Sequence, residues 1–164
     1  MRGPALALTL LGLTACWELL PASRDPIRDA RHRDPHVCAR GAPRYPAGLF
    51  EPGEIVSVEP LYYTRSERGE QRQILFGSSL ELKPFPGLTS EDLETLLNCH
   101  AVRCQLGRPG EPTVPDDPFC APGDVVHVHV EFDEGTTRVK VEAGDFDGAA
   151  ELWRRARAFV RPAG

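Results

Sequence analysis

The chain has 164 residues, of which 26% are charged and 41% hydrophobic, and its formal net charge is −5 at pH 7 with histidine neutral. This length corresponds to one domain with a short extension. From residue 45 onward 20 acidic residues outnumber 12 basic ones, which argues against a nucleic-acid partner, because such binding rests on neutralising phosphates.

The N-terminus has the pattern of a bacterial lipoprotein signal peptide. Arg2 precedes a ten-residue apolar run over residues 4–13, too short to span a bilayer but typical of a signal-peptide core. The run ends in Leu13-Thr14-Ala15-Cys16, which resembles the lipobox that precedes an acylated cysteine. We expect residues 1–15 to be removed and lipid, including palmitate-type chains, to anchor Cys16 in a membrane. The alternative is an ordinary secretory signal with an incidental cysteine.

The rest of the chain fits an exported protein. No other segment reaches the ~18 apolar residues needed to cross a membrane. Trp17 stands where an aspartate would favour inner-membrane retention, so we expect the outer membrane. Four cysteines remain besides Cys16, and an even number in an oxidising compartment indicates two disulfides, with three pairings open. They are Cys38, Cys99, Cys104 and Cys120.

The segment after the anchor is predicted to be a flexible tether. Residues 17–46 are rich in proline, arginine and aspartate and have little apolar periodicity. Residues 22–44 carry six arginines against three aspartates, and could lie on anionic headgroups or simply be solvated. Cys38 is the one point where this segment could be pinned. We therefore divide the chain into a leader over 1–15, Cys16 and the tether over 16–50, and a domain over 51–162.

The first part of the domain has the pattern of β-structure. Residues 54–59 are rich in β-formers, and Pro60 and the aromatic stretch 61–64 follow. A polar turn over 66–70 separates these from residues 73–76 and from the alternating stretch 79–84.

A helix is predicted next, from the capping residue Thr89 to about Leu106. At 100° per residue one face carries Leu93, Leu96, Leu97, His100 and Cys104, so His100 and Cys104 are expected on the core side. A loop over 108–123 contains Cys120.

The end of the chain predicts a hairpin and a second helix. Residues 125–132 and 137–142 alternate around a turn, with the valines and Phe132 on one side. The final helix spans residues 146–160, and its expected apolar stripe is Phe146, Ala149, Ala150, Trp153, Ala156 and Val160. Strands followed by helices indicate an α+β fold, a small antiparallel sheet with two helices packed on one face in a disulfide-stapled two-layer sandwich.

Five short stretches together resemble a group of uncharacterised exported proteins, many of them lipoproteins, from myxobacteria and related bacteria. They are residues 56–62, 86–93, 99–103, 117–118 and 150–156. The resemblance spans roughly residues 54–160, implies export and a similar fold, and carries no known activity. In that group one cysteine precedes the histidine and another occurs near the Asp-Pro position. The resemblance thus implies a Cys99–Cys120 bridge and leaves Cys38–Cys104 as the second.

The first candidate for chemistry is the cluster from Cys99 to Cys104. His100 and Cys104 are four residues apart on one helix face and could together bind zinc or copper. We favour the alternative of a buried histidine bonded to a backbone carbonyl beside a disulfide cysteine. A third possibility is that His100 opens into a cleft as the general base of an unrecognised enzyme.

A second candidate lies on the first strand of the late hairpin. His127 and His129 point to the same face, and Glu131 continues the alternation, so the three could hold a divalent cation. The alternative, which we favour, is a polar outer face that happens to use histidine.

Recognisable catalytic motifs are missing from the sequence, and the Asp116-Asp117 pair has the pattern of a solvated loop. We therefore expect a membrane-anchored envelope lipoprotein with a non-enzymatic binding or structural domain and no cofactor. Its expected partner is another envelope protein or a small ligand. The alternative function is a periplasmic module that binds divalent metal through His127 and His129.

Overall fold

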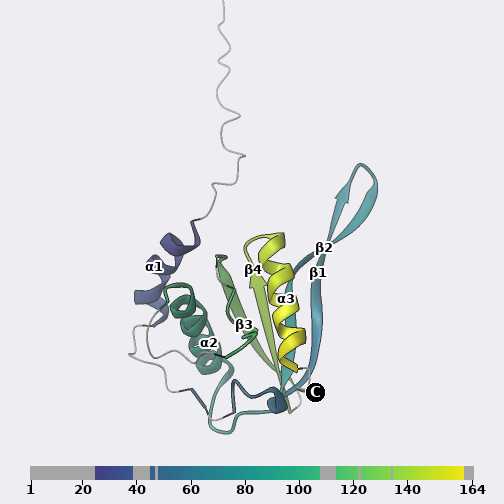
Figure 1. Ribbon diagram of the computed structural model, residues 1–164. Helices are drawn as coiled ribbons and strands as arrows, with labels where there is room; N and C mark the ends of the chain where they lie inside the picture. Colours follow the sequence, from purple (N-terminus) through teal and green to yellow (C-terminus); the bar gives the residue numbers. More distant parts are fainter. Residues whose placement is uncertain are drawn as a thin grey trace, which may run out of the picture.

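The computed structural model describes residues 25–38, 45–46, 48–107, 114–121, 123–133 and 135–160, drawn in Figure 1. Along the chain the elements are α1 (Pro26–Val37), the 3₁₀ turn η1 (Pro52–Glu54), β1 (Ile55–Glu67), β2 (Glu70–Leu82), α2 (Ser90–Gln105), β3 (Val126–Asp133), β4 (Thr136–Ala143) and α3 (Phe146–Val160).

The four strands form one antiparallel sheet in the order β1-β2-β4-β3. The core lies on the face of Leu80, Val128 and Val139, where α2 contributes Leu93 and Leu97, and α3 contributes further apolar side chains. The predicted α+β class is therefore confirmed, including the small antiparallel sheet, the helices packed on it and the two disulfides. The opposite face of β3 carries the exposed His127 and His129, as the alternation predicted.

β1 and β2 are longer than the sequence pattern predicted. Each is a single strand of 13 residues, where short segments interrupted by Pro60 were expected. Pro60 is compatible with a continuous strand because β1 is an edge strand, where the missing N–H can face away from the neighbour. The two strands meet at Arg68-Gly69, whose φ angles of 52° and 86° are those of the tight turns that close two-residue hairpins.

The far half of this hairpin projects beyond the sheet (Figure 1). β2 pairs with β4 only through residues 77–82, so residues 61–76 form a two-stranded arm that has no third strand among the described residues. At the base of the arm, Gly77 lies so close to the carbonyl of Val141 that a Cβ atom there would overlap it. A glycine is therefore required where β2 meets β4.

α3 buries Ala149 and Ala156 as predicted, but the rest of its buried stripe differs from the prediction. Its buried residues are Gly148, Ala149, Leu152, Ala156 and Phe159. Phe146 is 60% exposed, and Trp153 is half-buried with the guanidinium of Arg157 5.5 Å from its ring centroid. Gly148 packs directly against the carboxylate of Asp124, with no room for a Cβ, so only a glycine fits at this point of the buried face.

α1 lies within the segment for which the sequence predicted a flexible tether, and that prediction was wrong for residues 26–37. Asp25 caps the helix by accepting hydrogen bonds from the N–H groups of Ile27 and Arg28, at 3.0 and 3.2 Å. Only Ala30 is buried, so the sequence of α1 lacks the apolar periodicity that predicts an amphipathic helix. Instead α1 packs on α2 and is joined to it by a disulfide.

Polar side chains of α1 and α2 cover the outer edge of β3. The amide of Asn98 donates to the carbonyl of Val128 at 2.6 Å and accepts from the Val128 N–H at 3.0 Å. Glu94 accepts from the Val130 N–H at 2.9 Å, and Arg33 donates to the carbonyl of Val126 at 2.8 Å. These side chains satisfy backbone groups that would otherwise be open to pairing with another strand.

Candidate functional site

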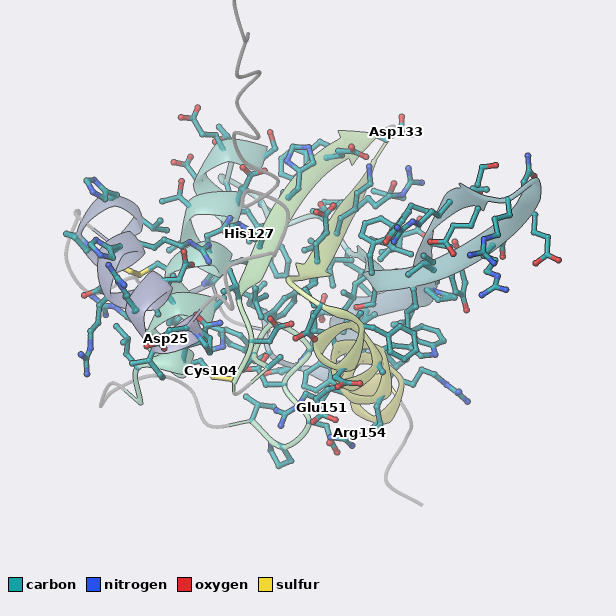
Figure 2. All side chains as sticks on the ribbon, turned by 90° about the horizontal axis from the view of Figure 1, so that it is seen from above. Asp25, Cys104, His127, Asp133, Glu151 and Arg154 are labelled. Atoms are coloured by element: carbon teal, nitrogen blue, oxygen red, sulfur yellow. A yellow bond between two sulfur atoms is a disulfide. The ribbon has the colours of Figure 1, made fainter. Side chains whose placement is uncertain are left out.

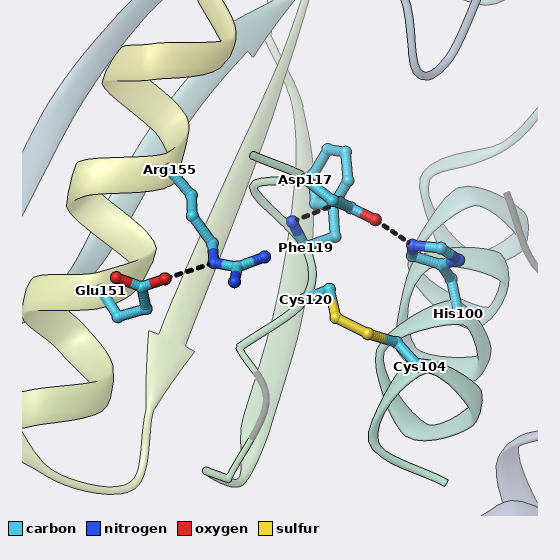
Figure 3. Close-up of a disulfide and its surroundings, with 7 residues drawn as sticks. All are labelled: His100, Cys104, Asp117, Phe119, Cys120, Glu151 and Arg155. Atoms are coloured by element: carbon cyan, nitrogen blue, oxygen red, sulfur yellow. Dashed lines mark hydrogen bonds and ion pairs between the residues drawn. A yellow bond between two sulfur atoms is a disulfide. The ribbon is translucent and has the colours of Figure 1, made fainter. Parts of the chain in front are cut away.

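His100 and Asp117 form a buried pair between α2 and the loop before β3, as Figure 3 shows. His100 Nε2 lies 2.6 Å from Asp117 Oδ2, and the two side chains are only 1% and 6% exposed. The other oxygen of Asp117 accepts a hydrogen bond from the N–H of Phe119 at 2.9 Å, an Asx-type turn. The carboxylate thus holds the loop in shape and ties it to α2.

Aromatic rings enclose this pair. The rings of Tyr45 and Phe50 have centroids 5.5 and 4.7 Å from that of His100, and Phe119 packs on Phe50 at 6.1 Å. Because its side chain is buried, His100 is not accessible to a substrate. The geometry therefore supports a structural role for His100 and not the general-base role considered from the sequence.

The sequence predicted the burial of His100 correctly but not its bond to Asp117. The Nε2 atom faces the carboxylate of Asp117, a residue that had been assigned to a solvated loop. Asp116 does lie on the surface, where it accepts from Arg154 at 2.9 Å. The sequence feature that distinguishes Asp117 from Asp116 is the Asp117-Pro118-Phe119 turn. In this turn the carboxylate of Asp117 accepts a hydrogen bond from the backbone N–H of Phe119, two residues further along the chain.

The disulfides join Cys38 to Cys99 and Cys104 to Cys120, so both pairings implied by the family resemblance are wrong. Cys99 and Cys104 point to different sides of α2, because five residues turn a helix by about 140°. Cys99 faces α1, with a Cα–Cα distance of 5.2 Å to Cys38. Cys104 faces the loop, with 6.1 Å to Cys120, and Figure 3 shows this bridge beside the His100–Asp117 pair. Its bond to Cys120 also removes Cys104 as a metal ligand.

The three residues proposed as a metal site are not arranged as one. His129 Nδ1 lies 2.8 Å from Glu94 Oε2, and its Nε2 is 3.7 Å from Glu131 Oε1. The same oxygen of Glu131 accepts from Lys140 at 2.6 Å, and this hydrogen bond lowers the pKa of Glu131. His127 lies on the same face of β3, as the alternation of buried and exposed residues along this strand shows. In the part of the chain that the structure describes, no three His, Cys, Asp or Glu side chains gather to hold a metal ion.

Three of the exposed large apolar side chains in the described residues lie on β1 and its arm. Val56, Tyr62 and Tyr63 are 59%, 50% and 46% exposed, and Tyr63 contacts the ring of Phe76 at 5.9 Å. The tip beyond them is charged, with ion pairs from Arg65 to Glu67 and from Arg72 to Glu70. The sequence singled out the aromatic stretch 61–64 only as a strand, because nothing local shows that it extends past the sheet.

An acidic and basic cluster lies on the outer side of α3. Glu151 accepts from Arg154 and Arg155, and these bonds lower the pKa of Glu151 to about 2 (Figures 2 and 3). Every member of this cluster is bonded to another, which is the arrangement of a surface network and not of a site awaiting a ligand.

A hollow of about 200 Å³ lies at the end of the sheet near the β3–β4 turn. It is lined by Pro84, Phe85, Phe132, Asp133, Gly135, Thr136 and Thr137, and contains none of the residues predicted as a site. Phe132 was expected with the core valines but is 46% exposed, because it lies past the end of the core at this rim.

None of the helices in the described residues is both long and apolar enough to cross a membrane. The predicted lipidation residue, Cys16, and the leader before it lie outside the described part of the chain. Comparison with known proteins found no matching family model, no matching curated protein and no matching solved structure.

Proposed function

We propose that this protein is a lipid-anchored component of the bacterial cell envelope whose domain binds another macromolecule and performs no catalysis. The observation that carries the binding role is the β1–β2 arm, which extends past the sheet and exposes Tyr62 and Tyr63. The His100–Asp117 pair, which a catalytic role would need at the surface, is buried instead.

The anchor is supported by residues 13–16 and by the two disulfides, which form and persist in oxidising compartments such as the bacterial periplasm. Helix α1 begins ten residues after Cys16. A fully extended chain of that length reaches at most about 35 Å, so the lipid would keep the domain close to the bilayer surface. The proposal favours the outer membrane because Trp17 follows the cysteine.

The anchor is tested by growing a bacterium that produces the full chain with a labelled fatty acid. We expect the label in the wild-type protein and none in Cys16→Ala, whose other four cysteines serve as an internal control. Absence of label in the wild type would reject the lipid anchor.

The binding role is tested by placing a photo-crosslinking amino acid at Tyr63 on the arm or, as the matched control, at Arg157 on α3. Illumination of intact cells is expected to give a discrete adduct of higher mass from the arm position alone. Adducts of equal amount from both positions, or from neither, would contradict a binding role for the arm.

A further inference from the structure

The two edge strands of the sheet, β3 and β1, differ in whether side chains bond the backbone groups along their free edges. Asn98, Glu94 and Arg33 bond the backbone of β3 along its free edge. β1 is the other edge strand, and among the described residues no strand pairs with its outer side. An edge strand of 13 residues left open in this way is a template for pairing with another strand.

The hairpin geometry defines which backbone groups of β1 point outward. In a two-residue hairpin the residues that flank the turn, here Glu67 and Glu70, bond to each other. Bonding toward the neighbour then alternates along an antiparallel strand, so Arg65 and Tyr63 face β2. The ladder has a bulge at this point, but its extra residue, Phe76, lies on β2, so β1 itself stays regular from Ser57 to Glu67. The outward set is Val58, Pro60, Tyr62, Thr64 and Ser66. Pro60, which has no N–H to offer β2, falls in the outward set as expected for an edge strand.

We propose that β1 pairs antiparallel with β1 of a second copy of this chain, with the two Tyr62 residues opposite each other on the twofold axis. This inference deepens the proposed function and rests on it for the role of the arm as the binding element. In this register Thr64 lies opposite Pro60 of the second copy, and Ser66 lies opposite Val58. The two sheets then join into one of eight strands.

Charge complementarity selects this register. Arg65 lies opposite Glu59 of the second copy, and by symmetry Glu59 lies opposite Arg65, so two opposite-charge pairs flank the axis. Both side chains are exposed, and both lie on the same face of β1 because they are six residues apart. A shift of the partner by two residues in one direction sets Glu67 against Glu59. A shift in the other direction sets Arg65 against Ser57 and loses both charge pairs.

The pairing is expected to be weak in free solution and strong on a membrane. Each Pro60 removes one ladder hydrogen bond, which limits the affinity of isolated chains. Lipid anchors on both copies would confine them to one surface and raise their effective concentration, as linkage does for tethered binding modules.

The test uses the full chain in the envelope of a bacterium that lipidates it. Tyr62→Cys places two thiols opposite each other, with Cα atoms about 5.5 Å apart, inside the range that a disulfide bridges. Thr64→Cys is the matched control on the same strand, because its symmetry mate would lie four residues away along the partner, about 13 Å. We expect Tyr62→Cys to give about tenfold more crosslinked dimer on a non-reducing gel than Thr64→Cys.

A charge exchange tests the register independently. Glu59→Arg alone and Arg65→Glu alone each set like charges opposite each other twice, and should lower crosslinking through Tyr62→Cys on the order of tenfold. The double exchange Glu59→Arg with Arg65→Glu should restore it. A structural effect of either substitution on the arm would not be repaired by the second.

Equal crosslinking of both cysteine variants, no crosslinking of either, or failure of the double exchange to restore the dimer would overturn the self-pairing. These results are distinct from a failure of the proposed function. An arm adduct whose mass is not twice that of the chain would keep the binding role and reject the second copy as its partner. Absence of fatty-acid label would reject the anchor and leave the crosslinking result to stand by itself.

Discussion

His100 and Asp117 illustrate how a polar pair can support a small core. The carboxylate bonds both the imidazole and the N–H of Phe119, so one side chain orders the loop and attaches it to α2. Burying polar groups is costly unless they are hydrogen-bonded, and here the pair and its aromatic surroundings meet that condition. The same residue types that suggested catalysis in the sequence are thus used for architecture.

Replacing Asp117 by Ala should therefore lower the free energy of unfolding by about 2–4 kcal/mol, since it removes two buried hydrogen bonds. The neighbouring Asp116→Asn, which removes the surface ion pair with Arg154 and keeps a residue type that tolerates the φ of 53° at this position, should cost less than ~1 kcal/mol. Urea denaturation of both variants measures the difference. Equal costs would contradict the structural role of Asp117.

The lowered pKa of Glu151 predicts how the stability of the fold depends on pH. Its hydrogen bonds from Arg154 and then Arg155 lower its pKa from the ordinary value of 4.5 to about 2. A lowered pKa means that the carboxylate stabilises the fold above about pH 4.5 and that this contribution is lost as the pH falls through about 2. Because Glu151 is 35% exposed, solvent screening limits the contribution to under ~1 kcal/mol.

The Glu151→Gln variant should accordingly be less stable than the wild type at pH 7, and the difference should fall toward zero near pH 2. Thermal unfolding followed across this range gives the comparison. A difference that stays constant with pH would show that the loss comes from packing and not from charge.

At the scale of elements, helix α2 connects most of the molecule. A capping box of Thr89 and Asp92 starts it at the capping residue that the sequence predicted. Outside the core face of α2, Cys99 forms the disulfide to α1 and Cys104 forms the disulfide to the loop before β3. Asn98 bonds the backbone of β3 where a neighbouring strand would otherwise pair.

Asn98→Ala should expose the backbone of Val128, because the Asn98 amide both donates to and accepts from that residue. We expect faster hydrogen exchange at the Val128 amide and a loss of about 1–3 kcal/mol in stability. Thr95→Ala, on the exposed side of α2, is the control and should change neither quantity. Unaltered exchange at Val128 in the Asn98 variant would mean that β3 is protected by something other than this side chain.

The two disulfides should differ in what they hold. They close loops with sequence separations of 61 and 16 residues, for which chain entropy gives about 4 and about 3 kcal/mol. Replacing Cys38 and Cys99 by alanine should release α1, seen as rapid hydrogen exchange over residues 26–37. Replacing Cys104 and Cys120 should instead loosen the loop around Asp117. Release of α1 in both variants would contradict this division.

Sequence patterns predicted the elements whose order depends on local signals. The capped helix, the β3–β4 hairpin and the burial of His100 follow from periodicity and caps. α1 was missed although Asp25 and Pro26 form a local start signal, because its only buried residue is Ala30 and no apolar periodicity follows. A disulfide and polar contacts to other elements stabilise it instead. The partner of His100 and the cysteine pairing depend on how a loop folds back on α2, which no local pattern encodes.

At the scale of the whole molecule, the arm and the core are separate parts. None of the buried core residues lies within residues 61–76. The arm is therefore available for binding without a cost to folding, and the opposite edge of the sheet is closed by α2. This division is what the proposed envelope function requires of a small domain held at a membrane.

Replacing residues 64–73 by Asn-Gly should consequently leave the fold intact. Tyr63 and Ile74 are paired across the hairpin, so a two-residue turn can join them directly. We expect a change in unfolding free energy of less than ~1 kcal/mol, because the deleted residues bury little apolar surface. Circular dichroism and denaturation measure this, and a large loss of stability would show that the arm belongs to the folding unit.

The intact mass of the full-length gene product, extracted from bacterial membranes and measured before and after reduction, reports on the proposed lipid anchor and on both disulfides at once. We expect a chain that begins at Cys16, carries diacylglycerol and a further acyl group, and gains four hydrogens on reduction. A chain without lipid would reject the proposed envelope anchor, and a mass that does not change on reduction would reject the two disulfides.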